Sequence, residues 1–281
     1  MIEFSGGVAV VTGAASGIGL GMARAFARKG MRLVVADIES DALALAADGL
    51  RADGAEVIAE RVDVSDAAAL ERLADVAYER FGQVTVLCNN AGVIENNLPT
   101  WEYSLADWDW VLGINLMGVV HGIRAFVPRM LDGGVAGHVV NTASFGGLIS
   151  GTANPIYIVS KHAVVALSEN LYNDLVVRDS KIKVSVLCPG WVRTGIVDSD
   201  RNRDNAPALT EKLARTRERF QAGLNTGIET DAVGAIVVDA ITQERFYIHT
   251  HPDWMDIVRD RFDAIADGMR PAISRIPNPK Q

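Results

Sequence analysis

Thr12-Gly13-Ala14-Ala15-Ser16-Gly17-Ile18-Gly19 lies between the first apolar run of the chain, Val8–Thr12, and its first segment of helical period, Gly17–Lys29. Glycines at such a strand-to-helix turn let the backbone approach a pyrophosphate, and the helix N-terminus offers free N–H groups to it. The spacing is Gly-x3-Gly-x-Gly rather than the commoner Gly-x-Gly-x2-Gly, and a glycine cluster alone could be only a tight turn. The place of this turn between the first strand and the first helix favours a dinucleotide site.

Outward from this turn, short β-branched runs alternate with longer segments of helical period. The expected strands are Val8–Thr12, Arg32–Ala36, Glu56–Val62, Val84–Cys88, His138–Thr142, Lys183–Leu187 and Phe246–Thr250. The expected helices are Gly17–Lys29, Ser40–Asp53, Asp66–Phe81, Leu105–Met130, Tyr157–Arg178 and Thr230–Thr242. The strands are apolar nearly throughout, which is typical of strands covered on both faces. We therefore expect a Rossmann-like, doubly wound α/β fold with a seven-stranded parallel sheet and helices on both faces.

Two regions interrupt the alternation. Residues 191–227 are long and charged, with a helix expected near Ala208–Gln221, and the tail 251–281 has an expected helix, Asp253–Gly268, before a Pro-containing end. A long excursion from a compact fold is either a lid or binding loop or a solvated loop, and both readings stay open. We expect one domain over 1–281, with its core at about 5–250.

Composition limits the classes of partner and compartment. The chain has 281 residues, 49% of them hydrophobic, which is enough for one large core, and a net charge of −8, which argues against nucleic acid. Cys88 and Cys188 each end an apolar run and are expected to be buried, reduced thiols. We expect no signal peptide, no segment of membrane-spanning length and a cytoplasmic location. His249 and His251 have no third ligand at a telling spacing, so no metal site is expected.

Asp37 ends the second expected strand, 18 residues past Gly19. A carboxylate there accepts hydrogen bonds from the ribose hydroxyls of an adenosine and repels a 2′-phosphate. Neither Ser16 nor Ile38 supplies a compensating positive charge, so the sequence favours NAD over NADP. The alternative is that Asp37 only caps the next helix.

Tyr157 and Lys161 are four residues apart on an expected helix and share one face. A lysine ammonium beside a phenol favours the phenolate and lowers the pKa of the tyrosine, which would make Tyr157 an acid/base near neutral pH. Ser144 directly follows the expected strand His138–Thr142, so its side chain is expected at the same crevice. Tyr-x3-Lys alone is common by chance, usually as a solvated helix face.

Further motifs follow in a fixed order along the chain. They are Asp63-Val64, Asn89-Asn90-Ala91-Gly92, Asn115, Ser144, Tyr157-x3-Lys161 and Pro189-Gly190 with Thr194. Together with the glycine turn, this set resembles the short-chain dehydrogenase/reductase family over about residues 5–250. The resemblance implies a strand order of 3-2-1-4-5-6-7 and an oxidoreductase that moves a hydride between NAD(H) and a secondary alcohol or ketone.

The resemblance also implies roles for particular residues. The catalytic residues would be Asn115, Ser144, Tyr157 and Lys161, with Asn115 holding a water beside Lys161. The cofactor-binding residues would be Gly13, Ser16, Gly17, Ile18, Gly19, Asp37, Ile38, Asp63, Val64, Asn90, Ala91, Gly92, Tyr157, Lys161, Pro189, Gly190, Val192 and Thr194. The substrate pocket would be lined by Glu95, Phe145, Leu148, Ile149, Asn154, Trp191 and Ile196.

Most of these pocket side chains are apolar, which predicts a bulky hydrophobic or aromatic substrate. Three segments are similar to a bacterial subgroup that includes dehydrogenases of lignin-type aryl-ether alcohols, namely Asp107–Trp110, Asn115–Gly118 and Thr250-His251-x2-Trp254. Phe246–Pro252 replaces the Val-Asp-Gly-Gly of many relatives, which leaves the geometry of the expected homodimer or homotetramer open. Two alternatives remain, an NADPH-dependent biosynthetic ketoreductase and a non-catalytic NAD(H) sensor.

Overall fold

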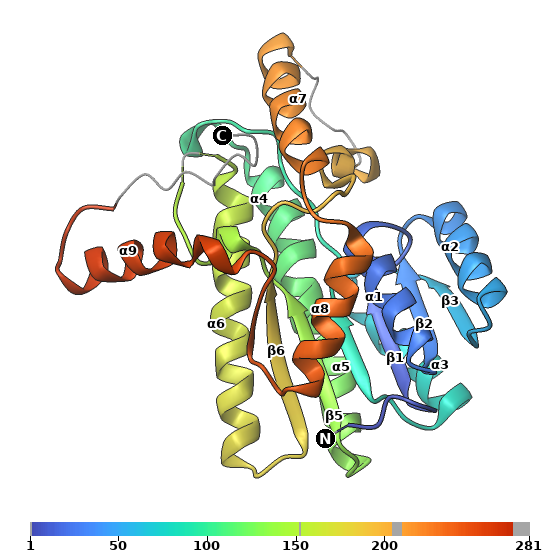
Figure 1. Ribbon diagram of the computed structural model, residues 1–281. Coiled ribbons are helices and arrows are strands. Elements are labelled where there is room, and N and C mark those ends of the chain that lie inside the picture. The colour runs from blue at the N-terminus through green and yellow to red at the C-terminus, as the bar shows by residue number, and fades with distance from the viewer. Residues whose placement is uncertain (1, 152, 204–209, 272–281) are drawn as a thin grey trace.

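The computed structural model describes residues 2–151, 153–203 and 210–271, and these contain one seven-stranded sheet (Figure 1). All strands are parallel, in the order β3-β2-β1-β4-β5-β6-β7, so the predicted doubly wound α/β fold and its strand order are confirmed. The strands are β1 (Val8–Thr12), β2 (Arg32–Asp37), β3 (Val57–Arg61), β4 (Val86–Asn89), β5 (Gly137–Thr142), β6 (Ile182–Cys188) and β7 (Tyr247–His249).

Side chains alternate across β1 and so build two apolar layers. Ala9 and Val11 belong to a buried cluster with residues of α1 (Gly17–Arg28), α2 (Ser40–Ala52) and α8 (Thr230–Thr242). Val8 and Val10 belong to a second cluster on the opposite face, with residues of α3 (Ala67–Phe81), α5 (Gly118–Asp132) and α6 (Pro155–Val177). Helices on both faces leave the carboxyl ends of the strands as the open edge, where a crevice forms in sheets of this kind.

The helix expected over Leu105–Met130 is continuous from Leu105 to Asp132. It consists of α4 (Leu105–Leu112), the π-helical η2 (Gly113–Met117) and α5, and Ser104 and Asp107 form a reciprocal capping box at its start. By length and composition it could cross a membrane, which corrects the expectation that no segment is long and apolar enough. Part of this helix packs in the core, where Phe126 has no exposed surface, whereas Leu105 at its start is exposed.

Several predicted boundaries shift by a few residues. The α6 helix begins at Pro155 rather than Tyr157, because proline suits the first helical position. The helix of the excursion, α7, spans Glu211–Asn225, while residues 204–209, including the predicted start at Ala208, lie outside the described residues. The tail has η5 (Pro252–Trp254) and α9 (Met255–Ala266), and its end, 272–281, also lies outside them. The remaining short helices are η1 (Thr100–Glu102), η3 (Phe145–Gly147) and η4 (Ile196–Asn202).

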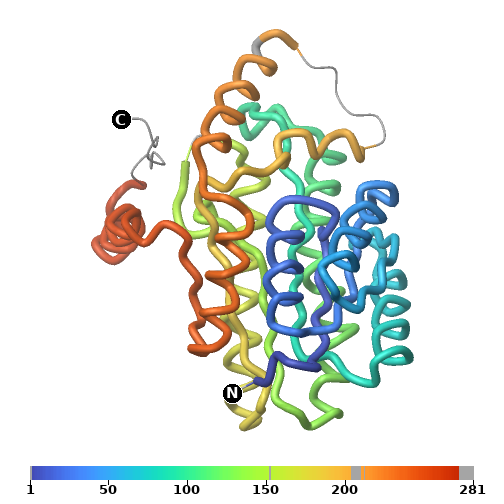
Figure 2. Tube along the Cα trace, turned by 45° about the vertical axis from the view of Figure 1, so that its right-hand side comes forward, coloured from blue at the N-terminus to red at the C-terminus, as the bar shows by residue number. Residues whose placement is uncertain are grey.

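The excursion after β6 leaves and rejoins the fold at one point. Val192 and Ile228 form a parallel bridge. On either side of it, the amide of Arg193 donates to the carbonyl of Ile228 at 3.0 Å, and the amide of Ile228 donates to the carbonyl of Trp191 at 3.1 Å. Between these ends lie η4 and α7, and Figure 2 shows α7 rising above the body of the molecule. We call residues 193–227 the lid segment and the paired residues at its base its neck.

Candidate active site

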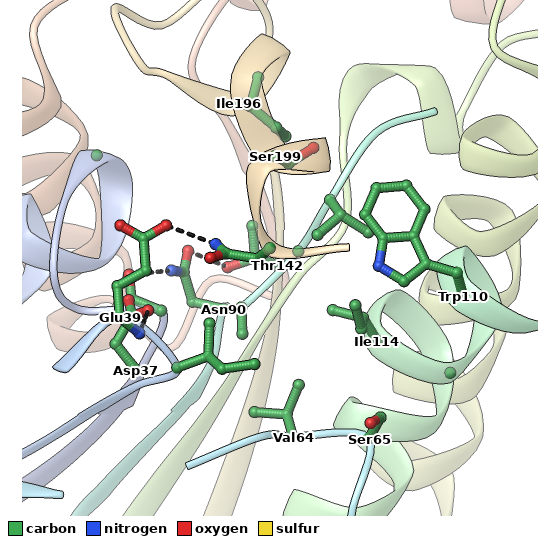
Figure 3. A pocket seen from close by; sticks show the side chains of 18 of the residues that line it. Asp37, Glu39, Val64, Ser65, Asn90, Trp110, Ile114, Thr142, Ile196 and Ser199 are labelled. Atoms are coloured by element: carbon green, nitrogen blue, oxygen red, sulfur yellow. Dashed lines mark hydrogen bonds between the residues drawn. The ribbon is translucent and has the colours of Figure 1, made fainter. Parts of the chain in front are cut away.

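A cavity of about 590 Å³ lies at the carboxyl ends of the strands. Its wall includes the glycine turn after β1, Asp37 of β2, Asn90 after β4, Thr142 of β5 and Pro189 after β6. In Figure 3, Asp37 and Glu39 lie on one side of this space and Trp110 and Ile114 on the other, with η4 residues Ile196 and Ser199 above. A long cavity bordered by so many strand ends has the shape that an extended dinucleotide requires.

The glycine turn is too tight for side chains. Gly13 and Gly17 have φ values of 66° and 58°, in the left-handed region that favours glycine. A Cβ on Gly13 would lie 2.8 Å from the Cα of Ala91, and one on Gly19 would lie 2.0 Å from the carbonyl oxygen of Gly13. Ser16 caps α1 without a side-chain hydrogen bond, which leaves the first N–H groups of the helix available to an anion. These features fit the pyrophosphate of a dinucleotide.

Asp37 is held in place by backbone amides. Its carboxylate accepts hydrogen bonds from Ala15 N at 3.0 Å and Glu39 N at 3.1 Å. Burial raises its pKa, and these two hydrogen bonds oppose that effect. Glu39 in turn accepts a hydrogen bond from Asn202 Nδ2 at 2.5 Å and pairs with Arg201 at 2.5 Å, so η4 is tied across the cavity (Figure 3).

Tyr157 and Lys161 both line this cavity from α6. The ammonium of Lys161 lies 5.5 Å from the centre of the Tyr157 ring and donates a hydrogen bond to the carbonyl of Thr142 at 2.9 Å. Burial raises the pKa of Tyr157 to about 12, although a hydrogen bond with Ser144 lowers it, and burial lowers the pKa of Lys161 to about 8. Burial disfavours both charged forms, so in this structure it outweighs any stabilisation of the phenolate by lysine, and the pKa of Tyr157 lies above its usual value rather than below it as the sequence predicts.

Ser144 and Asn115 are buried, and neither of them lines the cavity. Ser144 Oγ accepts a hydrogen bond from Gly146 N at 3.0 Å. Asn115 accepts from Val93 N at 2.8 Å and donates through Nδ2 to Val93 O and to Ser160 Oγ. Since both side-chain amide hydrogens are used, the Asn115 side chain can only accept, through a lone pair on Oδ1, from the water that the resemblance implies there.

Most of the predicted cofactor residues are brought together around the cavity. Those that line it are Gly13, Ser16, Gly17, Ile18, Asp37, Ile38, Asp63, Val64, Asn90, Ala91, Gly92, Tyr157, Lys161, Pro189 and Thr194. Three of the predicted cofactor residues, Gly19, Gly190 and Val192, do not line the cavity. Gly19 packs against Gly13, Gly190 packs against Trp254 and His251, and Val192 is buried in the neck of the lid segment.

The predicted substrate pocket is divided. Glu95, Asn154 and Trp191 line a second cavity of about 280 Å³ under α7, and Ile196 lines the larger one. Phe145, Leu148 and Ile149 line neither of these two cavities, and their place in the substrate pocket stays a prediction. The turn of η3 directs Phe145 and Ile149 into a buried cluster with Trp254 from the tail, whose ring centre lies 5.2 Å from that of Phe145. Leu148 packs in a neighbouring core cluster.

A family model described as short chain dehydrogenase matches residues 7–205. The chain belongs to the short-chain dehydrogenase family. Within it, this dehydrogenase is 39% identical over 258 residues to 1-deoxy-11-beta-hydroxypentalenate dehydrogenase of Streptomyces exfoliatus, covering 92% of this chain and 87% of that protein. It is 30% identical over 275 residues to C alpha-dehydrogenase of Sphingobium sp. strain SYK-6, covering 96% and 89%. A short-chain dehydrogenase/reductase from Burkholderia phymatum, solved in complex with NAD, is 45% identical with a TM-score of 0.94 and covers 98% of this chain and 99% of its own.

These relationships make this short-chain dehydrogenase an oxidoreductase that acts on CH–OH groups. Beyond the predicted Ile196, its cavity also has a wall that the sequence did not indicate, formed by α4 and the end of η4. Arg203 pairs with Asp107 at 2.6 Å and lies 5.0 Å above the Trp110 ring, so the end of η4 is fixed to α4. The aromatic run near Trp110 can be recognised in the sequence. Its spacing does not indicate, however, which turn of the helix lines the cavity.

Proposed function

We propose that this dehydrogenase interconverts a bulky secondary alcohol and its ketone with NAD(H), using Tyr157 as the acid/base. One observation carries the proposal. Tyr157 and Lys161 open on the same cavity as the glycine turn and Asp37. A proton-transfer residue and a dinucleotide cradle within one cavity match hydride transfer coupled to proton transfer.

The residues of the cavity would divide the chemistry as follows. NAD, when bound, accepts the hydride from the alcohol carbon and returns it in the reverse reaction. The amides at the start of α1 would hold the pyrophosphate, and Asp37 would accept hydrogen bonds from ribose hydroxyls. The Tyr157 phenolate would remove the hydroxyl proton during oxidation, while Ser144 donates a hydrogen bond to the same substrate oxygen. Protonated Lys161 would favour the phenolate through its charge.

The second cavity supports a bulky, apolar substrate. Polar residues, among them Glu95, Arg217 and Arg219, line part of it, and Ile94, Val197, Leu213 and Phe220 form an apolar side on which the Trp191 ring packs edge-on against Phe220 with centres 5.1 Å apart. Large apolar walls favour ligands that bury ring surface. The similarity to a hydroxypentalenate dehydrogenase and to a C alpha-dehydrogenase supports the same reading.

The test of this function is NAD-dependent turnover across secondary alcohols of small alkyl, benzylic, aryl-ether and steroid types, followed by nicotinamide absorbance. We expect kcat/KM for the bulky ring-containing alcohols to exceed that for the small alkyl ones by about 100-fold, since each buried ring face adds a few kcal/mol of binding. Turnover confined to small alkyl alcohols would overturn the substrate class. No turnover with any alcohol or ketone, together with tight NADH binding, would favour the sensor.

Cofactor preference gives a separate prediction. We expect NADH to bind about 100-fold more tightly than NADPH, because Asp37 faces the 2′-position and Arg201 is already paired with Glu39. Asp37→Asn, which keeps the acceptor for Ala15 N, should reduce that ratio to about tenfold or less. Asp41→Asn, on the exposed first turn of α2, is the control and should leave the ratio unchanged. Fluorescence titration gives the NADH and NADPH dissociation constants for each variant. Equal or tighter binding of NADPH than of NADH by the unmodified protein would favour the ketoreductase alternative.

The remaining expectations concern the oligomeric state, the cellular location and the domain organisation of the enzyme. A homodimer or homotetramer, a cytoplasmic location and the single-domain organisation of 1–281 stay predictions. The sensor alternative is disfavoured by Tyr157 and Lys161 in the cavity, since cofactor sensing needs no acid/base.

A further inference from the structure

The start of the catalytic helix lacks a local cap. The N-cap residue Asn154 has a φ of 51° and makes no side-chain cap hydrogen bond, and Pro155 has no N–H to satisfy. The next two amides, of Ile156 and Tyr157, are therefore the first donors of α6 that need a partner. A Ser, Thr or Asp at the N-cap usually accepts from those two positions.

Glu95 accepts from both of them, although it lies 61 and 62 residues away in the chain. Its Oε1 accepts from Ile156 N at 3.0 Å and from Tyr157 N at 3.2 Å, and its Oε2 lies 3.2 Å from Tyr157 N. The carboxylate comes from the segment after β4 and is only 5% exposed. A long-range residue thus occupies the position of an N-cap, and its negative charge suits the positive end of the helix dipole.

The contact between the two segments is reciprocal. Asn154 Nδ2 donates to the backbone carbonyl of Glu95 at 2.6 Å, and Asn154 N donates to Asn97 Oδ1 at 3.2 Å. Three side chains therefore join residues 95–97 to the start of α6, and these residues also line the second cavity. These contacts clamp the turn that carries Tyr157 against residues 95–97.

On this basis we propose that Glu95 is a positioning residue, which fixes the first turn of α6 and, through its charge, sets the pH range in which Tyr157 works. The proposal rests on the proposed function, which makes Tyr157 the acid/base. It adds a role for the Glu95 carboxylate to the sequence-based expectation that this residue lines the substrate pocket.

The electrostatic part of the proposal depends on all charges near the pair. Tyr157 is faced by Glu95, by Lys161 on its own helix, by Ser144 after β5 and by Cys188 at the end of β6. Glu95 is faced in turn by Asp107 of α4 and by the Tyr103 hydroxyl. Glu95 is the carboxylate that acts directly on Tyr157, and it raises the pKa of the phenol, whereas Lys161 carries the opposing positive charge when protonated.

Glu95→Gln tests the charge, because a glutamine oxygen still accepts both amides. Loss of the negative charge stabilises the phenolate, so the acid limb of the kcat/KM–pH profile for alcohol oxidation should move to lower pH. One pH unit below the wild-type midpoint, kcat/KM relative to its plateau should rise about threefold. Glu102→Gln, on the exposed η1 helix, is the control and should leave the profile unchanged. An unchanged profile in Glu95→Gln would overturn the electrostatic role.

Glu95→Ala tests the clamp without any substrate. Amide hydrogen exchange at Ile156 and Tyr157 should be about tenfold faster than in the wild type, since two amides lose a buried acceptor, whereas Glu95→Gln should keep it slow. Unchanged exchange in Glu95→Ala would overturn the positioning role. Because this measurement needs no turnover, it separates failure of the clamp from failure of the proposed oxidoreductase activity.

Discussion

Replacing Tyr157 with phenylalanine is expected to lower kcat for alcohol oxidation by about 1,000-fold, which is the contribution typical of a positioned acid/base. Phenylalanine keeps the ring that packs beside Lys161 and removes only the hydroxyl that bonds with Ser144. The dissociation constant for NADH should therefore change by no more than about twofold. Steady-state kinetics and fluorescence titration measure the two quantities.

Tyr172→Phe is the matched control for this substitution. Tyr172 lies on the same helix, α6, but is 41% exposed and packs against Phe246 far from the cavity. Its loss of a hydroxyl should leave kcat unchanged. A kcat for Tyr157→Phe within threefold of the wild type would remove Tyr157 as the acid/base.

The second large effect is expected at the glycine turn. Gly19→Ala should weaken NADH binding by at least about 100-fold and destabilise the fold by about 1–3 kcal/mol, as overpacking does. The new Cβ would lie 2.0 Å from Gly13 O and 2.8 Å from Asn90 Nδ2. Neither neighbour can retreat freely, because Asn90 itself is bonded to Thr12 O at 3.0 Å. The turn must open, and the amides at the start of α1 then lose the arrangement that holds a pyrophosphate.

Gly49→Ala provides the same chemical change where there is space. A Cβ on Gly49, which lies in α2, would meet nothing within 4 Å. This substitution should stabilise the protein by about 0.5–1 kcal/mol, because alanine loses less conformational entropy in a helix. Urea unfolding and NADH titration of both variants give the comparison. Wild-type NADH affinity in Gly19→Ala would contradict the assignment of the turn.

The main features of the fold were predictable because they depend on local pattern. Continuous apolar runs such as Val8–Thr12, alternating with segments of helical period, are typical of a parallel sheet covered by helices on both faces. The cavity wall was predictable where a motif is short, as in the turn around Gly13 or the pair of Tyr157 and Lys161. These residues are fixed relative to one another by one turn or one helix.

What the sequence did not reveal depends on contacts between distant segments. Phe145 and Ile149 were expected in the pocket because they follow Ser144, but a tryptophan of the tail, Trp254, draws them into the core. Glu95 was expected to face substrate, and nothing near it in the chain signals that its partners are amides of α6. In the same way, the tie between Glu39 and η4 joins residues that are 163 positions apart.

The neck between Val192 and Ile228 has a consequence for how such an enzyme diversifies. Since both ends of the lid segment are held together by backbone hydrogen bonds, its length is nearly free to change. Doubling a flexible loop costs only about 0.6 kcal/mol in closure entropy, so an insertion between η4 and Ile228 would leave in place the sheet and the η4 residues that line the dinucleotide cavity. Under the proposed function this part of the segment covers the substrate, so changes in it would alter substrate preference while the catalytic core keeps its structure.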